Sequence, residues 1–207
     1  MLSKNFLYGK DKLTVESVIK ILDGKLDCLV GDEELLKINQ SRRSIINVLK
    51  SERNTYGVNT GIGVLCSTII SKEDSRLLQE NLLKSHAVGV GENVPFEISK
   101  LMLIIKVHSL CKGFSGISIE VIERICWHID NNIIPIVPSQ GSVGASGDLA
   151  PLSHLFLPLI GEGKVLYKGK EVESKKVLQK EKKSLISLKE KEGLALINGT
   201  QFISAYT

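Results

Sequence analysis

Apolar residues recur at helical spacing along most of the chain. Residues 13–22 show this first, and Thr14 stands where a capping side chain would begin a helix. The same spacing predicts helices over about residues 32–51, 71–88 and 118–131, with Ser71 and Ser118 as caps of the last two. Residues 97–111 are apolar on most faces, which predicts a buried helix.

Two stretches depart from the helical pattern. Residues 133–138 are β-branched and interrupted by prolines, so we expect extended backbone there. They lead into a glycine-rich loop over residues 139–148, after which residues 149–160 again favour a helix. Residues 164–172 favour a small hairpin around Lys168-Gly169. The pattern therefore predicts a mainly α fold with a few short strands.

Composition narrows the class of protein. The 207 residues, 43% of them hydrophobic, are enough for one sizeable core. A net charge of +4 and an aromatic content of 5% do not favour a nucleic-acid partner. No apolar run is long enough for a signal peptide or a membrane span, so we expect a cytoplasmic protein with no membrane partner. The lysines of residues 164–192 alternate with glutamates, which favours a solvated face over an anion-binding patch.

Cysteines and histidines are scattered along the chain. Neither the four cysteines nor the four histidines have the spacing of a metal site, so we expect no metal. The glycine-rich segment, residues 141–151, is not a phosphate-binding loop because no lysine follows its glycines, so we expect no nucleotide. It also lacks the Gly-x-Ser-x-Gly arrangement of a nucleophile elbow. The simplest interpretation is a turn before a helix, with Asp148 as the cap.

A second interpretation concerns Ala145-Ser146-Gly147. A backbone nitrogen can attack the carbonyl two residues back only in a very tight bend, and Gly147 offers a nitrogen with no side chain in the way. Ala145 is small beside the attacked carbonyl, and the Ser146 hydroxyl can leave as water. Ring closure and dehydration, with two water molecules lost, would give an imidazolone with an exocyclic methylidene. That group is an electrophile, which standard side chains do not provide.

Residues 144–153, Gly-Ala-Ser-Gly-Asp-Leu-Ala-Pro-Leu-Ser, resemble the signature of the histidine and phenylalanine ammonia-lyase family. Residues 56–63, 85–91 and 193–201 resemble three further segments of that family, in its order. The resemblance implies a 4-methylidene-imidazole-5-one (MIO) cofactor formed from Ala145-Ser146-Gly147. It also implies the helical fold shared with aspartase and fumarase. Residues 1–200 would then be the amino-terminal, MIO-bearing domain, and residues 201–207 the start of a central helical domain.

The resemblance assigns roles in the reaction to three of these residues. Tyr56 would be the base that removes the substrate's β-proton, whereas its residue type alone suggests only a turn tyrosine. Because a phenol is a poor base at neutral pH, we expect its pKa to be lowered. Ser85-His86 resembles the pair found in members specific for histidine, since an imidazole substrate needs a hydrogen-bonding partner. The implied reaction is conversion of L-histidine to trans-urocanate and ammonia, through attack by either the amine or the imidazole ring.

Other residues would support the site. Asn198 would lie near cofactor and substrate, although Asn198-Gly199 alone is also a common turn pair. Gly144 and Asp148 would shape the cofactor loop. One departure from the family is Ser118, where many members have arginine, so we expect local contacts there to differ from theirs.

The resemblance also carries expectations about assembly. Members are longer homotetramers whose active sites take residues from three subunits, and this chain ends at Thr207. We therefore expect little or no activity from the chain alone, and exposed apolar surface that favours self-association. Two alternatives stay open: a non-catalytic domain that only folds or binds a partner, and a lyase or aminomutase acting on phenylalanine or tyrosine.

Overall fold

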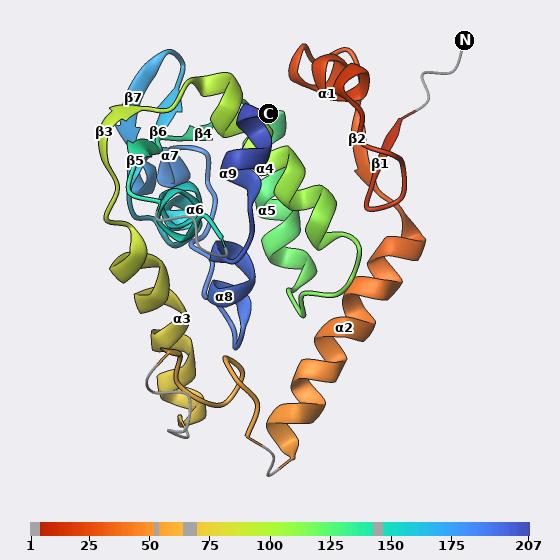
Figure 1. Ribbon diagram of the computed structural model, residues 1–207, viewed down its shortest axis with the longest axis vertical. Coiled ribbons are helices and arrows are strands. Elements are labelled where there is room, and N and C mark those ends of the chain that lie inside the picture. The colour runs from red at the N-terminus through yellow and green to blue at the C-terminus, as the bar shows by residue number, and fades with distance from the viewer. Residues whose placement is uncertain (1–4, 52–53, 64–69, 143–146) are drawn as a thin grey trace.

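The computed structural model describes residues 5–51, 54–63, 70–142 and 147–207, and most of them are helical (Figure 1). The helices are α1 (Val15–Leu22), α2 (Asp32–Lys50), α3 (Lys72–His86), α4 (Phe96–Leu110), α5 (Ile119–Asp130), α6 (Leu149–Phe156), α7 (Ser174–Lys180), α8 (Glu192–Ile197) and α9 (Gln201–Tyr206). A 3₁₀ turn, Leu157–Ile160, continues α6. The strands are β1 (Phe6–Tyr8), β2 (Cys28–Val30), β3 (Val90–Asn93), β4 (Ile134–Pro135), β5 (Pro138–Gln140), β6 (Lys164–Tyr167) and β7 (Lys170–Glu173). The predicted mainly α fold is confirmed.

Local capping explains where two helices begin. The Thr14 hydroxyl accepts from the Ser17 N–H at 3.2 Å, and the Ser17 hydroxyl accepts from the Thr14 N–H at 2.9 Å, which completes a capping box. Ser71 accepts from the Asp74 N–H at 3.1 Å and caps α3. Ser118 stands at the N-cap position of α5, as predicted, but without a side-chain cap. Its hydroxyl makes no capping bond, and its own N–H donates to the Glu192 carboxylate at 2.9 Å.

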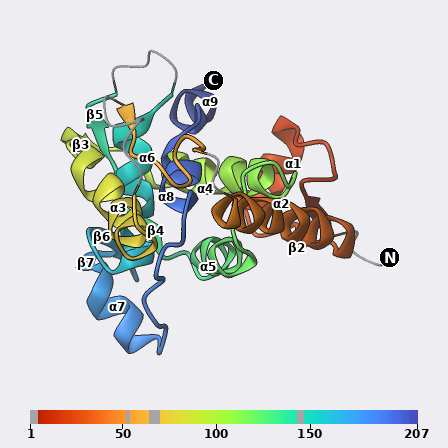
Figure 2. The ribbon, with the colours of Figure 1, turned by 90° about the horizontal axis from the view of Figure 1, so that it is seen from below.

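Helix α4 forms the centre of the hydrophobic core. Its residues Met102, Leu103, Ile104 and Val107 are at most 1% exposed. Helices α1, α5 and α9 pack around it (Figures 1 and 2). The prediction of a buried helix is confirmed, and burial of these side chains supplies much of the driving force for folding.

The strands form three small sheets rather than one. β1 pairs in parallel with β2, β3 pairs antiparallel with β5, and β4, β6 and β7 form an antiparallel sheet in that order. The loop between β6 and β7 has positive φ at Lys168 (50°) and Gly169 (76°), as a tight hairpin turn requires. The predicted hairpin is confirmed. Residues 133–138 are strand only at Ile134–Pro135 and from Pro138 onward.

The lysine-rich segment is solvated along most, but not all, of its length. The lysines between residues 164 and 183 are exposed. Glu190 and Glu192, by contrast, are 7% and 1% exposed. Glu190 pairs with Arg42 at 3.0 Å, and Glu192 accepts main-chain N–H groups. The expectation of a solvated face is therefore wrong for these two glutamates, because each is buried and bonded to partners elsewhere in the fold.

Candidate active site

The end of the glycine-rich loop packs directly against Asn198-Gly199. The Asp148 N–H donates to the Gly199 carbonyl at 2.8 Å. A Cβ on Gly147 would lie 3.1 Å from that carbonyl oxygen and 3.5 Å from Asn198 Oδ1. Both approaches leave little room for a side chain at residue 147. Glycine is therefore the residue that lets the loop reach this segment.

Asn198-Gly199 is not the hairpin turn that the residue pair alone would suggest. Asn198 ends α8 with extended backbone, at φ −85° and ψ 118°. Gly199 has a φ of 154°, and a Cβ there would collide with the Gln201 side chain. The segment instead joins α8 to α9 and lies alongside the end of the loop. Figures 1 and 2 show α8 between α3 and α6 on one side and α4 on the other.

Asp148 connects the loop to a helix that follows much later in the chain. Its side chain is fully buried. One carboxylate oxygen accepts from the N–H groups of Phe202 and Ile203 at 3.1 and 3.2 Å, and the other accepts from the Ser142 hydroxyl at 3.3 Å. Asp148 precedes α6 but makes no side-chain bond to it. The expectation that it caps this following helix was wrong, because its carboxylate caps α9 instead.

Gly144, Ala145 and Ser146 lie outside the described residues. Gly147 and Asp148 fit the implied cofactor. Asn198-Gly199 fills the space beside Gly147, so the residue there has no room for a side chain, and its nitrogen is unhindered. The buried Asp148 carboxylate holds the downstream end of the tripeptide in place.

Tyr56 lies in a loop that rests on α8. A Cβ on Gly57, whose φ is 67°, would come within 2.5 Å of the Leu194 side chain, so the loop and α8 touch here. Tyr56 is 52% exposed, and its hydroxyl accepts from the Gly63 N–H at 3.3 Å. Val58 and Thr60, each 2% exposed, anchor the loop. The tyrosine thus stands on an anchored loop, with its ring facing solvent.

Ser85 and His86 form the last turn of α3. His86 Nδ1 lies 2.9 Å from the Leu82 carbonyl oxygen and 3.1 Å from the Ser85 hydroxyl. Because a carbonyl can only accept, Nδ1 is the nitrogen that donates in this bond, and Nε2 is the ring nitrogen that does not take part in it. The pair is therefore polar and oriented, as hydrogen bonding to a substrate requires.

The chain after His86 runs beside the start of the glycine-rich loop. The Gly89 N–H donates to His154 Nε2 at 2.9 Å, and a Cβ on Gly141 would lie 2.9 Å from the Gly89 Cα. Burial lowers the pKa of His154, which keeps its ring neutral and able to accept. The sequence offered one signal for this contact, a histidine within the apolar helix that follows the loop.

Lys106 is a second residue that sequence reasoning missed. It lies in α4, is 2% exposed and donates to the Asn198 carbonyl at 2.9 Å. Burial lowers the pKa of this amine from 10.5 to about 7. Its position in a strongly apolar helix concealed it.

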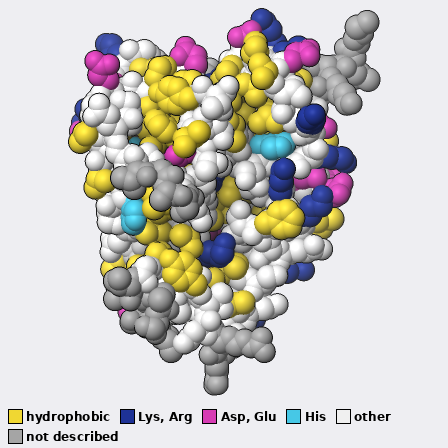
Figure 3. Space-filling model, viewed as in Figure 1, with side chains coloured by type: hydrophobic (Ala, Val, Ile, Leu, Met, Phe, Trp, Pro, Cys, Tyr) yellow, Lys and Arg dark blue, Asp and Glu magenta, His cyan; other side chains and the backbone are white. Residues whose placement is uncertain are grey.

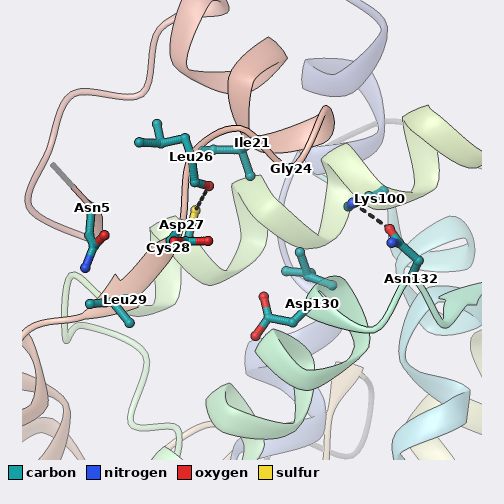
Figure 4. A pocket seen from close by; sticks show the side chains of 11 residues that line it. Asn5, Ile21, Gly24, Leu26, Asp27, Cys28, Leu29, Lys100, Asp130 and Asn132 are labelled. Atoms are coloured by element: carbon teal, nitrogen blue, oxygen red, sulfur yellow. Dashed lines mark hydrogen bonds between the residues drawn. The ribbon is translucent and has the colours of Figure 1, made fainter. Parts of the chain in front are cut away.

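These contacts bring some predicted residues together and leave others apart. Gly147, Asp148 and Asn198 meet directly. The loop of Tyr56 rests on α8, and His86 lies in the last turn of α3. No hydrogen bond among the described residues joins either side chain to Gly147. A pocket of about 490 Å³ lies elsewhere, where Asp27, Lys100 and Asp130 line a space between β2, α4 and α5 (Figure 4). None of the predicted site residues lines it.

Within the described residues, no helix is both long and apolar enough to span a bilayer. Comparison with known proteins places the chain in a family. The family description "Aromatic amino acid lyase" matches residues 13–207. The chain belongs to the aromatic amino acid lyase family. It is 42% identical over 195 residues to a histidine ammonia-lyase of Staphylococcus saprophyticus, which covers 94% of this chain and 39% of that protein. The chain therefore spans about two fifths of this relative's length.

Solved structures of the family confirm the fold. The histidine ammonia-lyase of Trypanosoma cruzi matches 98% of this chain with a TM-score of 0.87 at 36% identity, and the match covers 39% of that chain. The tyrosine aminomutase of Streptomyces globisporus matches 98% with a TM-score of 0.88 at 33% identity, covering 38% of that chain. Because lyase and aminomutase match almost equally, the fold does not distinguish between the two reactions.

Proposed function

We propose that this chain is the electrophile-bearing portion of a histidine ammonia-lyase, acting on L-histidine to give trans-urocanate and ammonia. The observation that carries the proposal is the packing of Gly147 and Asp148 against Asn198-Gly199 at the end of an Ala-Ser-Gly sequence. The identity of 42% to a histidine ammonia-lyase supports the choice of substrate.

The residues around the loop fit the implied cofactor. The MIO group, formed from Ala145-Ser146-Gly147, supplies an electrophile that activates the amino group for departure. Gly147 provides the unhindered nitrogen that ring closure needs. Asp148 fixes the downstream end of the tripeptide through its bonds to α9, and so limits the backbone freedom that would otherwise oppose a tight bend.

Tyr56 takes the β-proton of the substrate in this proposal. The residue is half exposed, and its loop is anchored on α8, which leads to Asn198. The Asn198 side chain lies beside Gly147, where it can orient a bound amino acid. His86 offers Nε2 as an acceptor for the imidazole N–H of the substrate, and Ser85 helps to hold the His86 ring in place.

The proposal extends to assembly. The chain spans about two fifths of its relatives, so we expect catalysis to require further chain and other subunits, in a cytoplasmic homotetramer. Figure 3 shows hydrophobic side chains gathered on the face that Figure 1 presents. Exposed large hydrophobic residues among those described include Val88, Val90, Leu149, Ile203 and Tyr206. Such surface supports burial against more polypeptide.

A complementation assay tests the proposed activity. The chain is mixed with the separately produced carboxy-terminal part of the Staphylococcus saprophyticus relative, and urocanate formation is followed. We expect activity with histidine, none with tyrosine or phenylalanine, and loss of activity in Ser146→Ala. Activity that prefers tyrosine would replace the substrate. A mixture that assembles but stays inactive with all three amino acids would favour a non-catalytic domain.

A further inference from the structure

Lys106 is a buried amine without a counter-charge. It is 2% exposed in the middle of α4, and no carboxylate of the described residues forms an ion pair with it. Burying an amine in this way is unfavourable, because the charged form loses its hydration. A lysine that served only packing could be replaced by a methionine of similar shape without that cost. Among the described residues its amine donates to the Asn198 carbonyl, at 2.9 Å, and this contact therefore calls for a functional account.

The bond fixes one side of the Asn198–Gly199 peptide. This peptide is trans, so its carbonyl and its N–H point in opposite directions. With the Asn198 carbonyl turned toward Lys106, the Gly199 N–H faces the other way. On that side, Gly199 N is 3.3 Å from the position that a Cβ on Gly147 would occupy. The lysine thus sets the face that this peptide presents to the end of the loop.

The next peptide is held by the loop itself. The Gly199 carbonyl accepts from the Asp148 N–H at 2.8 Å. Gly199 alone joins these two contacts, and glycine has more backbone freedom than any other residue. Without an anchor on the α4 side, the peptide could rotate and weaken the bond from Asp148.

We infer that Lys106 is a positioning residue. It orients the Asn198–Gly199 peptide so that this peptide holds Gly147 and Asp148 in the positions that the chemistry of the loop requires. Its catalytic meaning rests on the proposed function, since Gly147 ends the tripeptide that forms the electrophile. The orienting contact itself does not depend on that function, because it involves only described residues.

The chain offers a matched control on the same helix. Lys100 is also buried, at 6% exposure, and donates to the Asn132 side chain at 2.7 Å, on the side of α4 that faces the pocket of Figure 4. Burial lowers the pKa of both amines. Lys100→Met therefore removes a comparable amine and a comparable hydrogen bond without touching Asn198.

Hydrogen exchange of single amides, measured by NMR, tests the inference. In Lys106→Met we expect the Asp148 amide to exchange at least about tenfold faster than in the wild type, which corresponds to the loss of one hydrogen bond made by a charged group. Amides in the middle of α4 and α5 should exchange no faster than in the wild type, and neither should the Asp148 amide in Lys100→Met. A merely structural lysine would instead accelerate exchange throughout the core when it is replaced.

The inference is overturned if the Asp148 amide exchanges at the wild-type rate in Lys106→Met, or if Lys100→Met accelerates it equally. Should Lys106→Met not fold, Lys106→Gln is measured in its place, because its amide is one bond too short to hold the contact. Intact mass is recorded for each protein. A wild type that has not lost two water molecules contradicts the proposed function, while the exchange rates still decide the role of Lys106.

Discussion

Replacing Asp148 with alanine removes the one carboxylate that connects the glycine-rich loop to α9. The side chain is fully buried and accepts from the N–H groups of Phe202 and Ile203 at 3.1 and 3.2 Å, and from the Ser142 hydroxyl at 3.3 Å. Helix caps contribute about 0.5–2 kcal/mol, and hydrogen bonds to a charged group about 1.5–3 kcal/mol. Because Ile203 is at the surface, water can replace part of the loss.

We therefore expect Asp148→Ala to lower the free energy of unfolding by about 2 kcal/mol, and Tm by about 4–8 °C for a chain of this size. Asp148→Asn keeps an acceptor oxygen and should lose roughly half as much. The assay is thermal unfolding followed by circular dichroism, together with exchange of the Phe202 and Ile203 amides. Glu92→Ala is the control, since Glu92 is exposed and its side chain makes no hydrogen bond or ion pair with the described residues. It should change stability by less than about 0.5 kcal/mol.

The reasoning is refuted if Asp148→Ala unfolds at the wild-type temperature with unchanged exchange at Phe202 and Ile203. That result would mean that the buried carboxylate does not hold α9. It would also remove the physical reason for placing Asp148 in support of the loop.

Three other substitutions follow from the same structure. Lys106 has a pKa of about 7 in the folded chain and an ordinary value of 10.5, so between these pH values only the unfolded chain keeps the proton and stability rises with pH. Chemical denaturation should therefore find a larger free energy of unfolding for Lys106→Met than for the wild type at pH 7. This difference should shrink by up to about 1.4 kcal/mol per pH unit toward pH 10. A difference that stays constant with pH would contradict the buried-amine account. In the same assay, Gly57→Ala should lower the free energy of unfolding by about 1–3 kcal/mol more than Gly63→Ala does. Both glycines have positive φ, but only a Cβ at Gly57 would meet a neighbouring side chain. Equal losses would mean that the Tyr56 loop does not rest on α8. Glu190→Ala should cost about 1.5–3 kcal/mol, because Arg42 loses its carboxylate partner but keeps its hydrogen bond to the Gly116 carbonyl. A loss below about 1 kcal/mol would show that the pair is solvated.

Local signals predicted local structure well. Thr14 and Ser71 were recognised as caps because their partners, Ser17 and Asp74, lie three residues away. The Lys168-Gly169 hairpin was predictable for the same reason, since its turn depends on the two residues themselves.

Predictions failed where the partner is distant in sequence. Ser118 has the residue type of a cap, but the group that bonds its backbone is Glu192. Asp148 was expected to cap the next helix, and its carboxylate instead serves one that begins more than fifty residues later. Composition likewise could not show that Glu190 is buried, because Arg42 lies at the other end of the chain.

The candidate site divides in the same way. The resemblance to a known family identified the segments, including Asn198, from short motifs. It did not give Lys106 or His154, whose contacts with Asn198 and Gly89 exist only once the helices have packed. The apolar pattern that correctly predicted α4 as buried also made its lysine easy to overlook.

The intact mass of the purified chain, compared with the mass calculated from its sequence, tests the central claim most directly. The account predicts a deficit of two water molecules in the wild type and the full calculated mass in Ser146→Ala. An unmodified wild-type mass, in a chain shown to be folded, would contradict it. Ala145-Ser146-Gly147 would then be an ordinary loop in this chain, and its packing against Asn198-Gly199 would need another explanation.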